Sequence, residues 1–187
     1  MVPTLCRTLG VKGHRPVVGT WDCKDLLYVS AVVNVVTAAL HTRTLESPQQ
    51  ATRRTGRSKT ARLQGLFVQQ LREVARCYPA SRWSRVVVII DNAPWHRGDA
   101  VTRVLAACPH VEFYRLPSYS PQLNVIERFW KVLRRRATHN RLFATLAALK
   151  DSIRHSLSYF QTLRHRIHSL LASCYPSLEE RTALTGT

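Results

Sequence analysis

The sequence predicts an α/β domain in which a mixed sheet is flanked by helices. Three observations support this fold class. Short apolar runs rich in valine and isoleucine alternate with segments whose apolar residues recur at helical spacing. Turn-forming residues separate these segments. Finally, a length of 187 residues with 45% hydrophobic residues is enough to bury the core of one domain.

The early strand candidates lie in the first quarter of the chain. Residues 17–22 form a short candidate and residues 27–36 a stronger one, while residues 38–42 either continue that strand or pair with it. Residues 43–60 are rich in Thr, Ser, Gln and Arg. We predict a basic loop there, because such a segment cannot bury itself.

Helices and strands alternate in the rest of the chain. A helical period begins at Thr60 and ends before Tyr78, and Arg85–Asp91 is an apolar strand that ends in a carboxylate. Four further elements are predicted in order. They are a helix over 100–108, a strand over 111–116, a helix from 121 to about 137, and a long helical pattern over 146–171. Residues from about 138 to 187 are expected to form a C-terminal helical extension of a single domain spanning 1–187.

The charge of the chain points to a polyanionic partner. Lys and Arg number 28 against 11 Asp and Glu, for a formal net charge of +17 and an isoelectric point near 10.8. Each phosphate that such a protein neutralises releases condensed counterions, so nucleic acid is the expected partner. A solubilising charge is the alternative.

Cysteine usage predicts reduced, mostly buried thiols in an intracellular protein. The five cysteines are scattered, and they form neither a CxxC pair nor a cluster with zinc-finger spacing. Residues 1–20 carry no secretory signal, because prolines, glycines and an arginine interrupt them. The longest apolar run, over 26–40, is too short to span a membrane.

Two acidic residues are candidates for metal ligands. Asp91 directly follows a buried strand, which would hold its carboxylate rigidly at the sheet edge; a turn or helix-capping aspartate is the alternative. Glu127 lies three residues after Asn124, so both are expected on one helix face. The alternative for Glu127 is a surface glutamate paired with Lys131.

These residues lie in two segments, VVVIIDNAPWH and LPSYSPQLNVIERFWKVLRRR, that resemble the DDE transposases of the mariner-like superfamily, in particular their bacterial insertion-sequence relatives. Asp91 stands at the second acidic position of the family and Glu127 at the third, with 35 residues between them. A weaker resemblance extends through PTLCRTLGVKGHRPVV and THNRLFATLAALKDSI.

The resemblance implies a ribonuclease-H-like fold and a metal-dependent enzyme that cleaves phosphodiesters and transfers strands during transposition. It implies two Mg²⁺ or Mn²⁺ ions held by carboxylates. It also implies double-stranded DNA as partner, both transposon ends and target, and dimers or higher assemblies in the nucleoid of a bacterial cytoplasm.

The first acidic residue of the family is the point at which this sequence departs from the pattern. In the family it ends a strand upstream of the segment that Pro3–Val18 resembles, whereas Asp22 and Asp25 follow that segment. We therefore expect the chain to lack the first strand, the first catalytic Asp and any DNA-reading domain, and to be impaired in catalysis on its own. Recruitment of Asp22 is the alternative.

Supporting roles at the site are expected for Asn92, His96 and Asn124. Asn92 is expected to orient the turn, and His96 either approaches the metal site or caps the following helix. Candidate DNA contacts are basic residues in two clusters, with a solvated basic face as the alternative reading. They are Arg128, Lys131, Arg134, Arg135 and Arg136, and Arg53, Arg54, Arg57 and Lys59.

Two other functions compete with an active transposase. An inactive transposase remnant would act only as a nucleic-acid-binding module, and a nuclease or resolvase of the same fold would hydrolyse DNA without joining strands.

Overall fold

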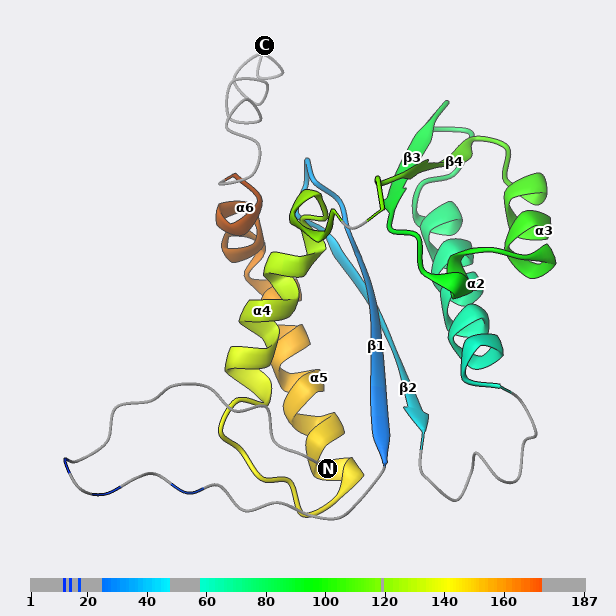
Figure 1. The fold of residues 1–187 in the computed structure, drawn as a ribbon. Coiled ribbons are helices and arrows are strands. Elements are labelled where there is room, and N and C mark those ends of the chain that lie inside the picture. Colours follow the sequence, from blue (N-terminus) through cyan, green and yellow to red (C-terminus); the bar gives the residue numbers. More distant parts are fainter. Residues whose placement is uncertain are drawn as a thin grey trace, which may run out of the picture.

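The computed structural model describes residues 25–47, 58–118 and 120–172, together with Lys12, His14 and Val17. This part of the chain forms four β-strands and five α-helices in a mixed α/β arrangement (Figure 1). The strand predicted over 17–22, and Arg53, Arg54 and Arg57, lie outside the described residues. No helix in the described ranges combines the length and apolar character needed to cross a membrane.

The first two strands form an antiparallel hairpin. β1 (Leu26–Val33) pairs with β2 (Leu40–Ser47), in a register that places Val33 opposite Leu40. In the turn, the Asn34 Oδ1 atom accepts hydrogen bonds from two backbone N–H groups, each at 2.9 Å. The pairing predicted for residues 38–42 is therefore confirmed.

The basic loop predicted over residues 43–60 is wrong at both ends. Residues 43–47 belong to β2, because pairing with β1 satisfies their backbone groups and Arg43 forms a 2.7 Å ion pair with Glu73. Residues 59 and 60 belong to a helix.

That helix is α2 (Lys59–Cys77), which agrees with the predicted element. Ser58 caps its N-terminus, since the Ser58 Oγ atom accepts a hydrogen bond from the Ala61 N–H at 3.2 Å. Its buried face includes Phe67, Leu71 and Val74, so the apolar period correctly identified both the helix and its core-facing side.

The next two strands are parallel. β3 (Val86–Ile90) pairs with β4 (Val111–Arg115), and α3 (Asp99–Ala107) connects them. A short 3₁₀ turn, Pro94–His96, precedes α3. Because the strands run in the same direction, their carboxyl ends meet at one edge, where the Leu116 N–H donates to the Ile90 carbonyl at 2.9 Å.

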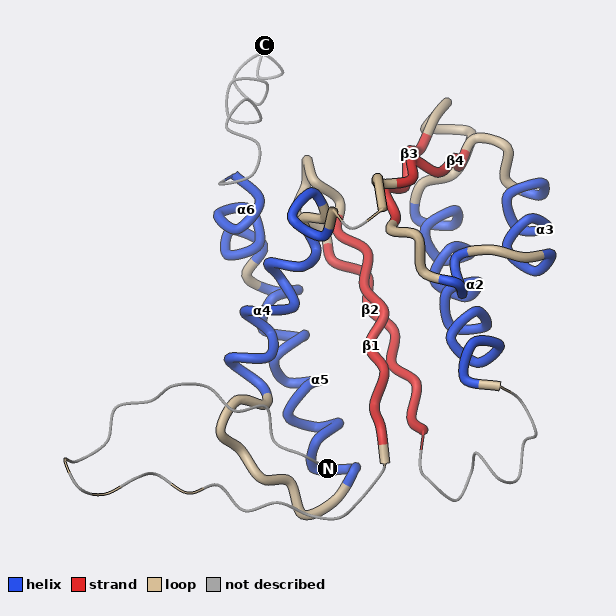
Figure 2. Tube along the Cα trace, viewed as in Figure 1, coloured by secondary structure: helices blue, strands red, loops and turns tan. Residues whose placement is uncertain are grey.

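A single mixed sheet is not formed by the described residues. Instead β1–β2 and β3–β4 are two separate two-stranded sheets, which Figure 2 shows as two pairs of red strands. The prediction of one sheet was wrong for this part of the chain, because no described segment pairs with the second edge of β1 or of β3.

Two predicted boundaries need correction in the last part of the described chain, which contains three helices. The helices are α4 (Ile126–Ala137), α5 (Leu146–Thr162) and α6 (Arg164–Ala172). The helix predicted from Pro121 begins only at Ile126, because a separate 3₁₀ turn, Pro121–Leu123, precedes it; there the Leu123 N–H donates to the Ser120 carbonyl, three residues back, at 3.1 Å. The long pattern over 146–171 breaks at Leu163.

Two apolar clusters hold these elements together. The first packs the β1–β2 hairpin against α4, α5 and α6, with Phe129, Leu133 and Phe160 among its buried residues. The second packs β3 and β4 against α2 and α3, and the β1 residue Val32 packs against it. In Figure 1, α4, α5 and α6 thus lie on one side of the β1–β2 hairpin, and α2 and α3 lie beside β3 and β4.

The cysteines differ from expectation where they are described. Cys77 is exposed and Cys108 is partly exposed, and both are free thiols. The prediction of buried thiols was wrong for Cys77, because it lies at the last residue of α2, where the helix leaves the core. The other three cysteines lie outside the described residues.

Candidate active site

Asp91 lies at the carboxyl end of β3, where the parallel strands end. Its side chain is 53% exposed. The Asp91 Oδ1 atom accepts a hydrogen bond from the Ala93 N–H at 3.1 Å and lies 2.9 Å from His96 Nδ1. The carboxylate is therefore oriented by its own turn while it remains open to solvent.

His96 contacts Asp91 and does not cap the following helix. Its ring packs on Phe67 at a centroid distance of 4.2 Å, and Gly98 provides the N-cap of α3 without a side-chain bond. Burial lowers the pKa of His96, an effect that the charge of Asp91 only partly opposes. The imidazole is therefore neutral near pH 7, and its Nδ1–H donates to the carboxylate.

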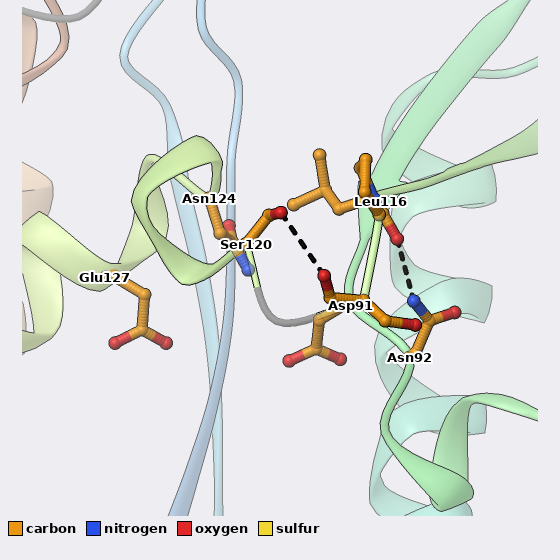
Figure 3. A pocket seen from close by; sticks show the side chains of 8 residues that line it. Asp91, Asn92, Leu116, Ser120, Asn124 and Glu127 are labelled. Atoms are coloured by element: carbon orange, nitrogen blue, oxygen red, sulfur yellow. Dashed lines mark hydrogen bonds between the residues drawn. The ribbon is translucent and has the colours of Figure 1, made fainter.

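Asn92 ties the two strand ends together. The Asn92 Nδ2 atom donates to the Leu116 carbonyl at 2.7 Å (Figure 3). Arg97 donates to Asn92 Oδ1 at 3.4 Å, and Arg115 donates to the His96 carbonyl at 3.1 Å. Sequence reasoning missed Arg97 and Arg115, since no motif marks a contact inside this turn or one between the turn and the end of β4.

Glu127 lies in the first turn of α4 and is partly buried. It lines the same cavity as Asp91, a space of about 370 Å³ to which Asn92, Ser120 and Asn124 also contribute. In Figure 3 the carboxylates of Asp91 and Glu127 point to the same side of the view. The residues that the structure describes form no ion pair between Glu127 and Lys131.

The donor set of this cavity suits a hard cation in part. Two carboxylates, the Asn124 side-chain oxygen and the Ser120 hydroxyl are oxygen ligands of the kind that Mg²⁺ and Mn²⁺ prefer. Among the described residues, no three His, Cys, Asp or Glu side chains are grouped to hold a metal ion. Asp25, just before β1, does not line the cavity, and Asp22 lies outside the described residues.

The predicted basic residues of α4 are exposed, and Arg136 also contacts the neighbouring helix α5. All five of these side chains are exposed, and they belong to Arg128, Lys131, Arg134, Arg135 and Arg136. The Arg136 guanidinium lies 3.7 Å from the ring centroid of Tyr159 in α5. Lys59, at the start of α2, lies 5.8 Å from the ring centroid of Tyr28.

A family model described as DDE superfamily endonuclease matches residues 45–150, more than half of the chain. This range contains both Asp91 and Glu127. No curated protein sequence matches the chain.

Three solved structures share the fold. The Mos1 transposase paired-end complex with the left transposon end matches 95% of this chain with a TM-score of 0.56 and 16% identity. The Mos1 mariner paired end complex with Mn matches 94% with a TM-score of 0.55 and 18% identity. The Mos1 strand transfer complex matches 95% with a TM-score of 0.54 and 16% identity. The chain covers 51%, 52% and 50% of these chains, about half the length of each.

Proposed function

Because this chain belongs to the DDE superfamily of endonucleases, we propose that it is the catalytic domain of a DNA transposase of the mariner-like superfamily, from the bacterial insertion-sequence branch. The proposed activity is metal-dependent phosphodiester cleavage and strand transfer. The observation that carries the proposal is one cavity lined by Asp91, Glu127 and Asn124, which come from segments far apart in the sequence.

Asp91 and Glu127 are the proposed metal-binding residues, with Asn92, His96 and Asn124 in support. Divalent ions bound there would activate the attacking oxygen and stabilise the leaving oxygen of the phosphodiester. The Nδ1–H of His96 and the N–H of Ala93 hold Asp91 Oδ1 in one orientation. The hydrogen bond from the Asn92 side chain to the Leu116 carbonyl holds this turn against the end of β4. The position of the Asp91 carboxylate is therefore fixed by the ends of two paired strands.

Double-stranded DNA is the proposed partner, as transposon end and as target, within a homodimer in the bacterial nucleoid. Two of the similar Mos1 structures are a complex with a transposon end and a strand transfer complex. The net charge of +17 and the exposed basic side of α4 support phosphate contact next to the acidic cavity. Arg53, Arg54 and Arg57 remain proposed contacts.

The test measures Mn²⁺ binding and nicking of supercoiled DNA by the full 187-residue chain and by Asp91→Asn and Glu127→Gln variants. Each substitution removes one anionic ligand and keeps the shape of the side chain. We expect each to weaken Mn²⁺ binding by about tenfold or more, and to remove any Mn²⁺-dependent nicking.

Asp151→Asn is the matched control, because Asp151 is an exposed carboxylate of α5 that does not line the cavity. It should bind Mn²⁺ as the unchanged chain does. If all three variants bind Mn²⁺ and DNA equally well, the acidic pair is not a metal site, and the chain acts only as a nucleic-acid-binding module.

A further inference from the structure

The segment between β3 and α3 comprises residues 91–98, and we call it the Asp91 turn. Its first part is held at the end of β4 by the hydrogen bond of Asn92. Arg115 holds its middle part, because the guanidinium donates to the His96 carbonyl at 3.1 Å. Figure 1 shows that the segment then passes in front of α2 before it enters α3.

The last part of the Asp91 turn is held by a side chain of α2. The Gln64 Nε2 atom donates a hydrogen bond to the carbonyl of Arg97, 33 residues later in the chain. The next carbonyl, that of Gly98, accepts from the Val101 and Thr102 N–H groups at 3.0 and 3.1 Å and so belongs to the first turn of α3. The Arg97 carbonyl precedes that helix, so Gln64 supplies a donor that α3 does not.

Gly98 lets the turn come close to this side chain. Its φ is 98°, in the left-handed region that favours glycine. A Cβ atom at this position would lie 2.8 Å from Gln64 Nε2, which is closer than such atoms pack. The amide of Gln64 therefore occupies the space that a larger residue at position 98 would fill, and α2 and the Asp91 turn are in close contact.

A second contact with the turn comes from the same face of α2. Phe67 lies three residues after Gln64, so the two side chains are neighbours on the helix surface. The Phe67 ring packs on the His96 ring at a centroid distance of 4.2 Å. The His96 Nδ1 atom in turn lies 2.9 Å from Asp91 Oδ1. Neighbouring side chains of α2 thus hold both the end of the turn and the ring that contacts the carboxylate.

We propose that Gln64 is a positioning residue for the Asp91 carboxylate. Its hydrogen bond closes the end of the Asp91 turn against α2, and this keeps the His96 ring between Phe67 and the carboxylate. When the bond is lost, the end of the turn is free to move away from α2 and to carry His96 with it. The effect on metal binding rests on the proposed function, whereas the effect on the turn does not.

The contribution of Gln64 is local, because its side chain is not part of the apolar core. Gln64 is partly exposed, whereas the neighbouring Leu63 and Leu66 are buried. A substitution that removes the amide but keeps a similar volume takes away one hydrogen bond and leaves no cavity in the core. Such a substitution should loosen the Asp91 turn while the fold persists.

The experiment compares Gln64→Met, Gln64→Lys and Gln69→Met in the full 187-residue chain. Methionine is similar in length to glutamine but cannot donate a hydrogen bond, whereas lysine keeps a donor. Gln69→Met is the matched control, because Gln69 is an exposed glutamine of the same helix. A helix turns by about 100° per residue, so the two glutamines point in directions that differ by about 140°.

Amide hydrogen exchange of Ala93 reports the position of the carboxylate without any metal, because the Ala93 N–H donates to Asp91 Oδ1 at 3.1 Å. We expect this amide to exchange about fivefold faster in Gln64→Met, the effect of losing one hydrogen bond that closes the turn. In Gln69→Met and in Gln64→Lys it should exchange as in the unchanged chain.

Mn²⁺ affinity separates a positioning role from a merely structural one. It is measured at a temperature at which every variant is folded, so a small loss of stability alone does not change it. We expect Gln64→Met to bind Mn²⁺ about fivefold more weakly than Gln69→Met, because the ligand is less well oriented, and Gln64→Lys to bind Mn²⁺ more tightly than Gln64→Met.

Equal exchange of the Ala93 amide in Gln64→Met and Gln69→Met would overturn the proposal, even if Asp91 binds Mn²⁺. Faster exchange in Gln64→Met with an unchanged Mn²⁺ affinity would also overturn it, because the turn would then loosen without displacing the carboxylate. An unchanged chain that binds no Mn²⁺ would instead contradict the proposed metal site, and exchange of the Ala93 amide would still decide whether Gln64 positions Asp91.

Discussion

His96 is the residue at which burial and charge oppose each other most directly. Its side chain is only 16% exposed and packs on Phe67, yet it also contacts Asp91. Burial is the largest cause of the change in its pKa, which lies below the ordinary value of 6.5. In the folded state, the chain therefore resists protonation of this ring.

A pH-dependent loss of stability follows from this shift. Above pH 6.5 the ring is mostly neutral in both the folded and the unfolded chain, so the lowered pKa does not change the free energy of unfolding. Below that pH, the unfolded chain binds a proton that the folded chain resists. The free energy of unfolding should therefore fall as the pH drops from about 7 toward the lowered pKa. Urea unfolding across this range, compared with a His96→Gln variant, measures the contribution of this ring. Parallel pH profiles for the two proteins would contradict the prediction.

The individual site residues were only partly predictable from the sequence. Asp91 and Glu127 could be identified because each sits in a recognisable local segment. The hydrogen bonds of Arg97 and Arg115 could not. The first depends on the conformation of the turn after β3, and the second joins groups 19 residues apart whose approach is set by the parallel pairing of β3 and β4.

At the scale of elements, α4 has two kinds of basic residue on its exposed side. Arg136 stacks on Tyr159 and so links α4 to α5. Arg135 is exposed at the next position, without such a ring contact. Arg136 therefore has a packing role, whereas the neighbouring Arg135 has the proposed DNA-binding role.

The variants Arg135→Ala and Arg136→Ala should consequently differ in what they lose. Arg135→Ala is expected to weaken DNA binding and to reduce the salt dependence of the affinity, because one phosphate contact is removed. Arg136→Ala is expected to lower the free energy of unfolding by about 0.5–1 kcal/mol, the usual contribution of an exposed cation–π contact. Filter binding at several salt concentrations and thermal unfolding measure the two effects. Identical losses in both variants would show that the stacking on Tyr159 has no separate role.

Element types were predictable where the apolar period was long, as in α2, and where a valine run was bounded by turn residues, as in β3. Helix starts and breaks were not. The turns over 120–127 and the break at Leu163 depend on hydrogen bonding and packing that the apolar period does not encode. The pattern allowed the pairing of β1 with β2, but it did not predict that the four described strands form two separate sheets.

At the scale of the whole molecule, the two proposed metal ligands belong to different apolar clusters. Asp91 follows β3, which packs in the cluster of α2 and α3, whereas Glu127 lies on α4, which packs against the β1–β2 hairpin. An ion bound by both carboxylates would connect the two clusters.

Mn²⁺ should therefore stabilise both clusters together. At a free concentration about 100 times the dissociation constant, binding to the folded chain alone adds about 2.7 kcal/mol to the free energy of unfolding. Amide exchange of Val104 in one cluster and Leu133 in the other should slow in parallel. In Glu127→Gln the two amides should respond much less. Slowing of only one amide in the unchanged chain would show that the ion is held by one side of the cavity.

The packing of Val32 has a consequence for this geometry. Val32 belongs to the hairpin, but its side chain packs against the apolar cluster of α2, α3, β3 and β4, next to Asp91. It therefore lies between the two apolar clusters, which are called the two halves here. A larger or smaller residue there would alter how far the halves stand from each other. The volume of this aliphatic side chain, together with the Arg43–Glu73 ion pair that also joins the halves, thus contributes to the alignment of the two acids.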